Sequence, residues 1–244
     1  MVFPDMFGLL KLPLADLILA YQQSDATGKA IVIVQLGISA VALCIMIAKF
    51  KVFRKMAFSI SRFRKLFGEN AGVLNLYRSG GYTDNPAEAI YQRACGKIVD
   101  LFGPAGLEGW ANGDDTVTGL ADTELEVVKA SAENSLSEQE IEVESGMSML
   151  ATAITASPLL GLFGTVIGVL SAFQSMGRSG SALLSDVAPG ISSAMLTTVV
   201  GLIVAIPTSV VYNVLQTRIK AIQVQLEGFT DDLKGRIGCE FKQR

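Results

Sequence analysis

Three long stretches of the sequence contain no charged residue. They cover residues 30–48, 145–177 and 187–217 and are separated by segments that carry most of the charge. A helix rises about 1.5 Å per residue, so crossing a bilayer core of about 30 Å takes roughly 20 apolar residues. We therefore predict transmembrane helices over residues 29–49, 145–177 and 187–217, of which the second and third are longer than one crossing needs.

The segment between the first two stretches also follows a helical pattern. In residues 50–76, apolar positions recur at helical spacing, which predicts that the first helix extends beyond the membrane. A second helix is predicted over residues 86–101, followed by a glycine-rich loop over residues 103–119 and a helix over residues 120–144 that runs into the second span. The expected fold is all-α and polytopic, with long helices extending into a cytoplasmic helical domain over residues 50–144.

Basic residues predict the orientation of the chain in the membrane. Arg218 and Lys220 follow the third span, and seven more basic residues follow the first: Lys49, Lys51, Arg54, Lys55, Arg62, Arg64 and Lys65. Because basic residues favour the cytoplasmic side, we expect a periplasmic N-terminus and a C-terminal cytoplasmic helix over residues 218–244. For residues 1–28 we predict either an amphipathic segment that lies in the periplasmic interface of the same membrane or an ordered periplasmic tail.

The composition excludes several classes of protein. Of the 244 residues, 50% are hydrophobic and 18% are charged, and the mean hydropathy is +0.44, which does not fit a disordered chain. The sequence contains no histidine, so the common histidine-based catalytic and metal sites are absent. Three separated cysteines form no CxxC pair, and a net charge of −3 gives no basic field for nucleic acid. We expect no enzyme activity, no cofactor, no metal cluster and no nucleic-acid partner.

An acidic segment precedes the second span. Residues 108–144 contain eleven acidic side chains and one basic side chain, Lys129. One interpretation is a solvated helical face. The other is that this segment pairs with the basic residues 49–65, in the same subunit or in a neighbour. The sequence leaves both interpretations open.

Small residues recur at helical spacing in the last two spans. Gly164 and Gly168 form a GxxxG pair, Gly161 precedes them by one turn, and Gly201 lies in the third span. Glycines at this spacing let helix backbones approach closely in lipid, so we predict that these four residues pack helix against helix. Three prolines are predicted to kink or break the spans: Pro158, Pro189 and Pro207.

Hydroxyl side chains form a second pattern at membrane depth. Ser193, Thr197 and Gly201 are spaced by four and share one helix face, and Thr198 lies about 100° further round. A single hydroxyl can bond back to its own helix, but a cluster opposite Thr165 on the second span favours a lined interface or pore. We predict that Thr165, Ser193, Thr197 and Thr198 line an ion pathway.

Two of these segments resemble a known family. The sequences SPLLGLFGTVIGVLSAF (residues 157–173) and VAPGISSAMLTTVVGLIVAIPTSVVYNVL (residues 187–215) resemble the signature helices of the ExbB/TolQ/MotA ion-channel proteins, and most closely those of the ExbB/TolQ branch. The family motifs GLFGT, APGI, GL, AIP and YN occur in this sequence in the same order. The N-terminal half of the chain matches only in architecture.

The resemblance implies a machine in the bacterial inner membrane. It implies a homopentameric ring around about two copies of a single-span ExbD- or TolR-like partner, whose transmembrane aspartate takes and releases the ion. Ion flow would then energise outer-membrane transport or envelope work through a TonB-like or Tol–Pal-like transducer. The family's pore threonines fall on Thr165 and Thr198.

One position departs from the family pattern. Ser193 stands where the ExbB/TolQ branch usually has a glutamate, so spans two and three contain no titratable carboxylate. The coupling ion is then either a proton handled by the partner or a sodium ion, slightly favoured here, held by the oxygens of Ser193, Thr197 and Thr198. The alternatives in function are a stator subunit of a flagellar or gliding motor and a non-conducting membrane scaffold.

Overall fold

The computed structural model is built from helices. It describes residues 18, 21–22, 24–70, 72–79, 85–111, 119–179 and 184–241, and within these ranges it contains no β-strand. The main elements are α2 (Ala26–Glu69), α3 (Asn75–Ser79), α4 (Pro86–Ala111), α5 (Asp122–Glu144), α6 (Met147–Ser179) and α7 (Leu184–Phe241). The all-α prediction is confirmed. Most of the predicted N-terminal segment over residues 1–28 lies outside the described residues.

Three helical segments of the described chain are long and apolar enough to cross a membrane. They are Ala26–Glu69, Asp122–Arg178 and Val187–Phe241, and their most apolar windows have mean hydropathies of 2.7, 1.9 and 2.1. Each contains one of the predicted transmembrane stretches. Most residues in these windows are not buried, as expected for helices that face lipid or other subunits rather than a protein core. The prediction of three transmembrane helices is confirmed.

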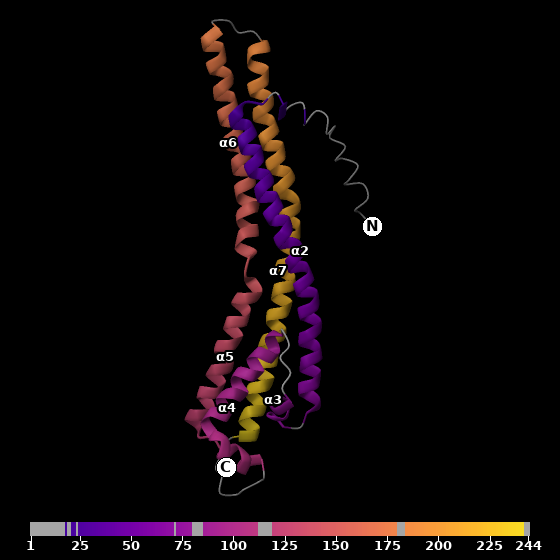
Figure 1. The fold of residues 1–244 in the computed structure, drawn as a ribbon, viewed down its shortest axis with the longest axis vertical. Coiled ribbons are helices and arrows are strands. Elements are labelled where there is room, and N and C mark those ends of the chain that lie inside the picture. The colour runs from indigo at the N-terminus through magenta and orange to yellow at the C-terminus, as the bar shows by residue number, and fades with distance from the viewer. Residues whose placement is uncertain are drawn as a thin grey trace. The chain divides into compact units, whose positions relative to one another are not determined.

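The chain divides into two compact units. The first, called here the membrane unit, contains residues Met1–Ala48 and Gly146–Val214, and the second, the extramembrane unit, contains Lys49–Ser145 and Leu215–Arg244. Within the membrane unit, α6 and α7 lie side by side and α2 packs against both of them, as Figure 1 shows. Its buried residues are mostly small, whereas large side chains such as Phe163 and Met195 are exposed.

The core of the extramembrane unit is apolar and partly aromatic. A stripe of buried residues runs along α7 with spacings of three or four: Leu215, Ile219, Ile222, Leu226, Phe229, Leu233 and Ile237. This spacing is typical of a helix that packs along one seam. Phe63 and Phe67 of α2 meet Tyr91 of α4 and Phe229 of α7 edge to face, with ring centroids 5.4–5.8 Å apart.

Two glycines change the predicted element boundaries. The expected loop over residues 103–119 is wrong in its first part, because α4 continues to Ala111 on the far side of one non-helical residue, Gly103 (φ 65°, ψ 171°). The helix predicted over residues 120–144 does lead into the second span, but with a two-residue break, because α5 ends at Glu144, Gly146 has φ 77° and α6 begins at Met147. Glycine reaches these positive φ values without a steric penalty.

The predicted extension of the first helix is confirmed but ends earlier. Helix α2 stops at Glu69, where Arg236 of α7 closes its end. The guanidinium donates hydrogen bonds to the carbonyl oxygens of Phe67 and Asn70, which have lost their helical donors, and lies 4.3 Å from the centre of the Phe67 ring. One turn further along α7, Glu240 accepts a hydrogen bond from the backbone N–H of Val73.

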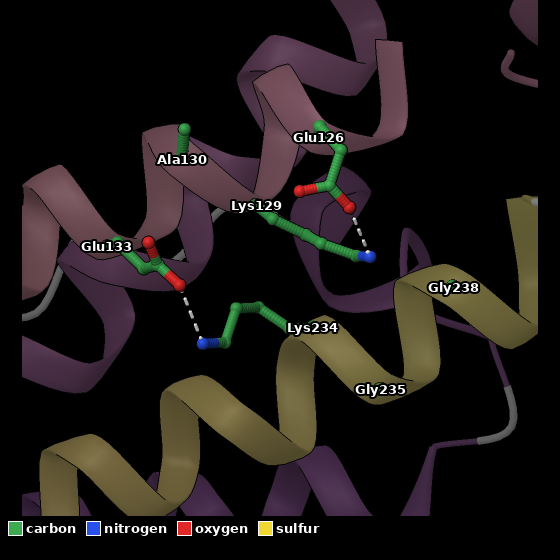
Figure 2. Close-up of a pocket in the computed structure, with 7 residues that line it drawn as sticks. All are labelled: Glu126, Lys129, Ala130, Glu133, Lys234, Gly235 and Gly238. Carbon is green, nitrogen blue, oxygen red and sulfur yellow. Dashed lines mark hydrogen bonds and ion pairs between the residues drawn. The ribbon is translucent and has the colours of Figure 1, made fainter. Parts of the chain in front are cut away.

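In the described part of the acidic segment, two of the ion pairs involve residues outside the basic run, and the basic run is met at Lys49, which donates a hydrogen bond to the carbonyl oxygen of Val143 at 3.0 Å beside the charge of Glu142. Glu138 pairs with Arg93 at 2.8 Å, and Glu133 pairs with Lys234 at 2.9 Å. Figure 2 shows the second pair across a shallow groove of about 440 Å³ between α5 and α7. Within the basic run, Arg64 pairs instead with Asp232 at 2.7 Å. Exposed pairs of this kind contribute about 0–1 kcal/mol each, so within one chain the acidic segment is largely a solvated face with local ion pairs. Pairing with the basic residues of a neighbouring subunit stays a prediction.

Candidate functional site

Glycines bring α6 and α7 into backbone contact. A Cβ atom added at Gly161 would lie 2.9 Å from Thr198 Cα, and one added at Gly168 would lie 2.8 Å from the carbonyl oxygen of Gly190. A Cβ atom at Gly164 would overlap the side chain of Thr197. Three predicted packing glycines therefore lie at one seam, where only hydrogen in place of a side chain permits the close approach.

The glycines of α7 complete this seam from the other side. A Cβ atom at Gly190 would lie 2.9 Å from the carbonyl oxygen of Gly168. A Cβ atom at Gly201 would lie 2.5 Å from the carbonyl oxygen of Ser157 and 3.0 Å from Gln35 Nε2. Gly190 was not among the predicted packing residues, although it is the glycine of the motif APG (residues 188–190).

Two threonines of α7 donate hydrogen bonds to the same carbonyl of α6. Thr198 Oγ1 donates to the oxygen of Gly161 at 3.1 Å, and Thr197 Oγ1 donates to it at 3.3 Å and to Ala194 of its own helix at 2.8 Å. Threonine usually bonds back to its own helix, so the Thr198 bond is an interhelical one that the motif alone could not establish. The close approach at Gly161 makes this bond possible.

The four predicted pathway residues differ in exposure. Thr165 and Thr198 are partly exposed, whereas Ser193 and Thr197 are buried, with 2% and 1% of their surface accessible. Thr165 Oγ1 donates to Leu162 of its own helix at 2.6 Å. Within one chain, therefore, only the first two hydroxyls border a surface that another subunit or water can reach.

Ser193 faces the first span. A Cβ atom at Gly28 of α2 would overlap the Ser193 hydroxyl, so this serine packs between α7 and α2. Ser193 and Thr198 are five residues apart, which separates them by about 7.5 Å along the helix axis. Oxygen ligands of hard cations such as calcium bind at about 2.3–2.6 Å, so the structure engages these two hydroxyls separately rather than around one ion.

The three predicted kink residues lie inside long helices. Pro158 belongs to α6, and Pro189 and Pro207 belong to α7. Both helices continue across their prolines. A proline removes the backbone N–H that the carbonyl four residues earlier would accept in a helix. For Pro158 that carbonyl belongs to Ile154, one turn before the glycine seam.

Gln35 of α2 is a buried polar residue that the sequence analysis missed. Its side chain is fully buried, and Nε2 donates hydrogen bonds to the carbonyl oxygens of Ser157 at 3.2 Å and Thr197 at 3.1 Å. One amide thus joins all three spans. A signal was present, because Gln35 is the single amide in the charge-free residues 30–48, but a count of charges does not register a neutral side chain.

A carboxylate also belongs to the membrane unit. Asp25 precedes the first residue of α2, and its Oδ2 atom accepts a hydrogen bond of 2.6 Å from Ser171 Oγ of α6. Asp25 was not among the predicted site residues, because it lies before the first charge-free stretch. The bond joins the start of α2 to α6.

These observations define a class of protein: an all-α membrane protein with three candidate spans, the last two joined by a glycine and threonine seam. A model described as the MotA/TolQ/ExbB proton channel family matches residues 104–228, just over half of the chain, and includes the whole seam. The chain belongs to this family. It is a family of channel proteins and not a family of enzymes.

Individual relatives agree with this assignment. A protein named Tol-Pal system protein TolQ from Pseudomonas aeruginosa is 27% identical over 179 residues, which are 72% of each chain. A TolQ from Haemophilus influenzae is 42% identical over 95 residues, 38% of this chain and 42% of the relative. A biopolymer transport protein ExbB from Pseudomonas putida is 40% identical over 84 residues, 34% of this chain and 26% of the relative. The matches to the last two thus span less than half of each relative.

Proposed function

We propose that this chain is the ion-channel subunit of a motor of the ExbB–ExbD or TolQ–TolR type. The motor would use the ion-motive force across the inner membrane to energise outer-membrane transport or envelope work. The observation that carries the proposal is the Thr198–Gly161 hydrogen bond, because it places a hydroxyl on the partly exposed edge of the seam that the family model covers. Polar groups at membrane depth normally face other helices or an aqueous path.

The proposed ion pathway follows Thr165 and Thr198. Both side chains are partly exposed in the single chain, so both can face a pore formed with other subunits. Ser193 and Thr197, which are buried between the chain's own helices, support the pathway from behind rather than line it. This divides the four predicted residues into two that contact the ion path and two that hold the helices in place.

The proposed coupling ion is the proton. The family is described as a proton channel family, and spans two and three contain no carboxylate or histidine that could bind a proton. The proton must then be carried by an aspartate on a single-span ExbD- or TolR-like partner, while this chain supplies the lining. Moving one charge through 100 mV releases about 2.3 kcal/mol, which such a partner could convert into movement. Sodium is the alternative that flux measurements must exclude.

The proposed assembly is a homopentamer around about two copies of that partner. Large exposed apolar side chains on α6 and α7, such as Phe173 and Ile206, give surfaces suited to lipid or neighbouring subunits. The N-terminus would be periplasmic and the C-terminus cytoplasmic, because basic residues follow the first and third spans. The relatives named TolQ support a Tol–Pal-like transducer as the system that the motor energises, and those named ExbB support a TonB-like transducer.

The test is ion flux through the reconstituted complex with its co-purified partner. Thr165→Val and Thr198→Val should preserve assembly and lower proton flux by about tenfold, which corresponds to losing about 1.4 kcal/mol of polar stabilisation along the path. Thr152→Val is the matched control, because this threonine of α6 is exposed, donates only to Ser148 of its own helix at 2.9 Å, and points about 140° away from Thr165.

Four outcomes would contradict the proposal. Wild-type flux in both variants would remove the pathway assignment. Flux that needs sodium and persists with a protonophore would replace the proton with sodium. A complex that lacks any partner and conducts nothing would favour a membrane scaffold, and a partner with a peptidoglycan-binding domain would favour a flagellar-type stator.

A further inference from the structure

The three spans meet around one buried amide. Gln35 of α2 is fully buried and donates both of its amide N–H groups, to Ser157 of α6 and Thr197 of α7. Gly201 leaves the space for this amide, since a Cβ atom there would lie 3.0 Å from Gln35 Nε2 and 2.5 Å from the carbonyl oxygen of Ser157. The donor side of the amide is therefore fully satisfied by backbone carbonyls.

The acceptor side is not satisfied within the described part of the chain. Gln35 Oε1 and Ser157 Oγ are both buried and have no hydrogen-bond partner among these residues. Both atoms belong to residues that touch each other, because the nitrogen of the same amide binds the carbonyl of Ser157. Buried polar atoms without partners are rare and call for an explanation such as an ordered water.

A third polar group lies on the same turn of α6. Pro158 has no N–H, so the carbonyl of Ile154 lacks its usual helical donor. Ile154 precedes Ser157 by three residues, which puts both on one face of the helix. The sequence thus provides an amide oxygen, a hydroxyl and a freed carbonyl at one level of the membrane unit.

We propose that Gln35 Oε1 and Ser157 Oγ hold a buried water molecule between α2, α6 and α7. A buried water typically makes about three hydrogen bonds to polar groups that would otherwise have no partner, and this is what the amide oxygen, the hydroxyl and the Ile154 carbonyl offer. A bare cation fits less well, because these oxygens carry no formal charge and an uncompensated charge at membrane depth is costly. The site is separate from the proposed pathway along Thr165 and Thr198 and does not depend on it.

A double-mutant cycle on the full chain tests the shared water. Ser157→Ala should lower the Tm in nanodiscs by about 2–4 °C, because the water loses one partner. In the Gln35→Met background, where the water has lost its other partner, Ser157→Ala should leave the Tm unchanged or raise it. Gly37→Ala on α2 is the control for a neutral change, since a Cβ atom there meets nothing within 4 Å. Equal effects of Ser157→Ala in both backgrounds, or a rise in the Tm in both, would overturn the proposal.

A density map that resolves ordered water provides the second measurement, and it does not require any variant to fold. The expected result is a peak within hydrogen-bonding distance of both Gln35 Oε1 and Ser157 Oγ, unchanged when sodium is replaced by choline. The proposal is overturned if the site is empty while other buried waters are resolved, or if the Ser157 hydroxyl bonds directly to Gln35. A peak that disappears without sodium would also overturn it in favour of a cation.

Discussion

At the scale of single residues, a hydroxyl in a membrane span has several ways to satisfy its hydrogen bond. Thr165 donates to its own helix, whereas Thr198 donates across the seam. The sequence spacing could not separate these cases, because both geometries suit the same residue type. The difference depends on how closely the neighbouring backbone approaches, and here Gly161 decides it.

Cys95 is expected to be chemically inert in the folded protein. Burial raises the pKa of its thiol to about 12, and the charge of Glu240 adds to this, although a hydrogen bond with Tyr91 opposes it. The thiolate is the reactive form, so maleimide at neutral pH should label the exposed Cys239 quickly and Cys95 only after unfolding. Mass spectrometry of labelled peptides measures both rates. Fast labelling of Cys95 in the folded chain would contradict its burial.

The same thiol predicts a pH dependence of stability. In the unfolded chain the Cys95 thiol ionises near pH 8.5, well below its folded pKa of about 12. The unfolded state therefore loses its proton first, and stability should fall as the pH rises through this window. Cys95→Ala should reduce that alkaline loss, even if it lowers the Tm at neutral pH by opening a small cavity. Thermal unfolding at several alkaline pH values provides the measurement.

Glu140 is expected to destabilise the extramembrane unit at neutral pH. Partial burial raises the pKa of its carboxyl group, and the nearby charges of Glu227 and Glu144 raise it further. Because the folded pKa is above the unfolded one, the ionised form is penalised by folding, and the penalty disappears as the pH falls through the folded pKa. Glu140→Gln should raise the Tm near pH 7 and have little effect near pH 4. Glu138→Gln, which breaks an ion pair with Arg93, is the control and should not raise it.

At the scale of elements, the glycine seam makes a sharp prediction. Gly164→Ala should lower the Tm strongly and weaken the oligomer, because the new methyl group overlaps the Thr197 side chain and forces α6 away from α7. Gly177→Ala on the same helix meets nothing within 4 Å and should be neutral or stabilising, since alanine favours helix by about 1 kcal/mol. Thermal unfolding and native electrophoresis compare the two. Equal effects of the two variants would remove the seam from the explanation of packing.

The break between α5 and α6 depends on one backbone conformation. Gly146 has φ 77°, a value that costs an L-residue about 1–2 kcal/mol. Gly146→Ala should therefore destabilise the protein by about that amount, whereas Gly238→Ala, in a helical and open position on α7, should not. Denaturant or thermal unfolding measures the difference. If alanine were tolerated at residue 146, the two helices would have to join without this turn.

The elements were more predictable than their junctions. Charge-free stretches located all three spans because a membrane helix needs about 20 apolar residues whatever it packs against. The break at Gly103 was predicted as a long loop and the break at Gly146 was not predicted, because the φ angle of a glycine cannot be read from the sequence. Gln35 was missed for a related reason, since only the folded structure shows that a neutral side chain is buried against two other helices.

At the scale of the whole molecule, the two units follow different rules of packing. The membrane unit buries small residues, such as Ala153 and Ala194, and leaves large ones outside, whereas the extramembrane unit buries aromatic and aliphatic side chains around α7. The sequence shows which segments belong to each unit, because charged residues are absent from the spans and frequent outside them. The sequence does not show which face of each helix is buried, because that depends on contacts between segments far apart in the chain.

The clasp at the last turns of α7 has a consequence for biosynthesis. Arg236 closes the end of α2, Glu240 binds Val73, and the carbonyl of Phe241 accepts a hydrogen bond from Leu120 at 2.8 Å. All of these partners leave the ribosome well before α7 does. The extramembrane unit can close only after that helix has been translated, and until then Phe63 and Phe67 lack the aromatic partner Phe229. This unit therefore completes its folding late, and until then its apolar surface is open to non-native contacts.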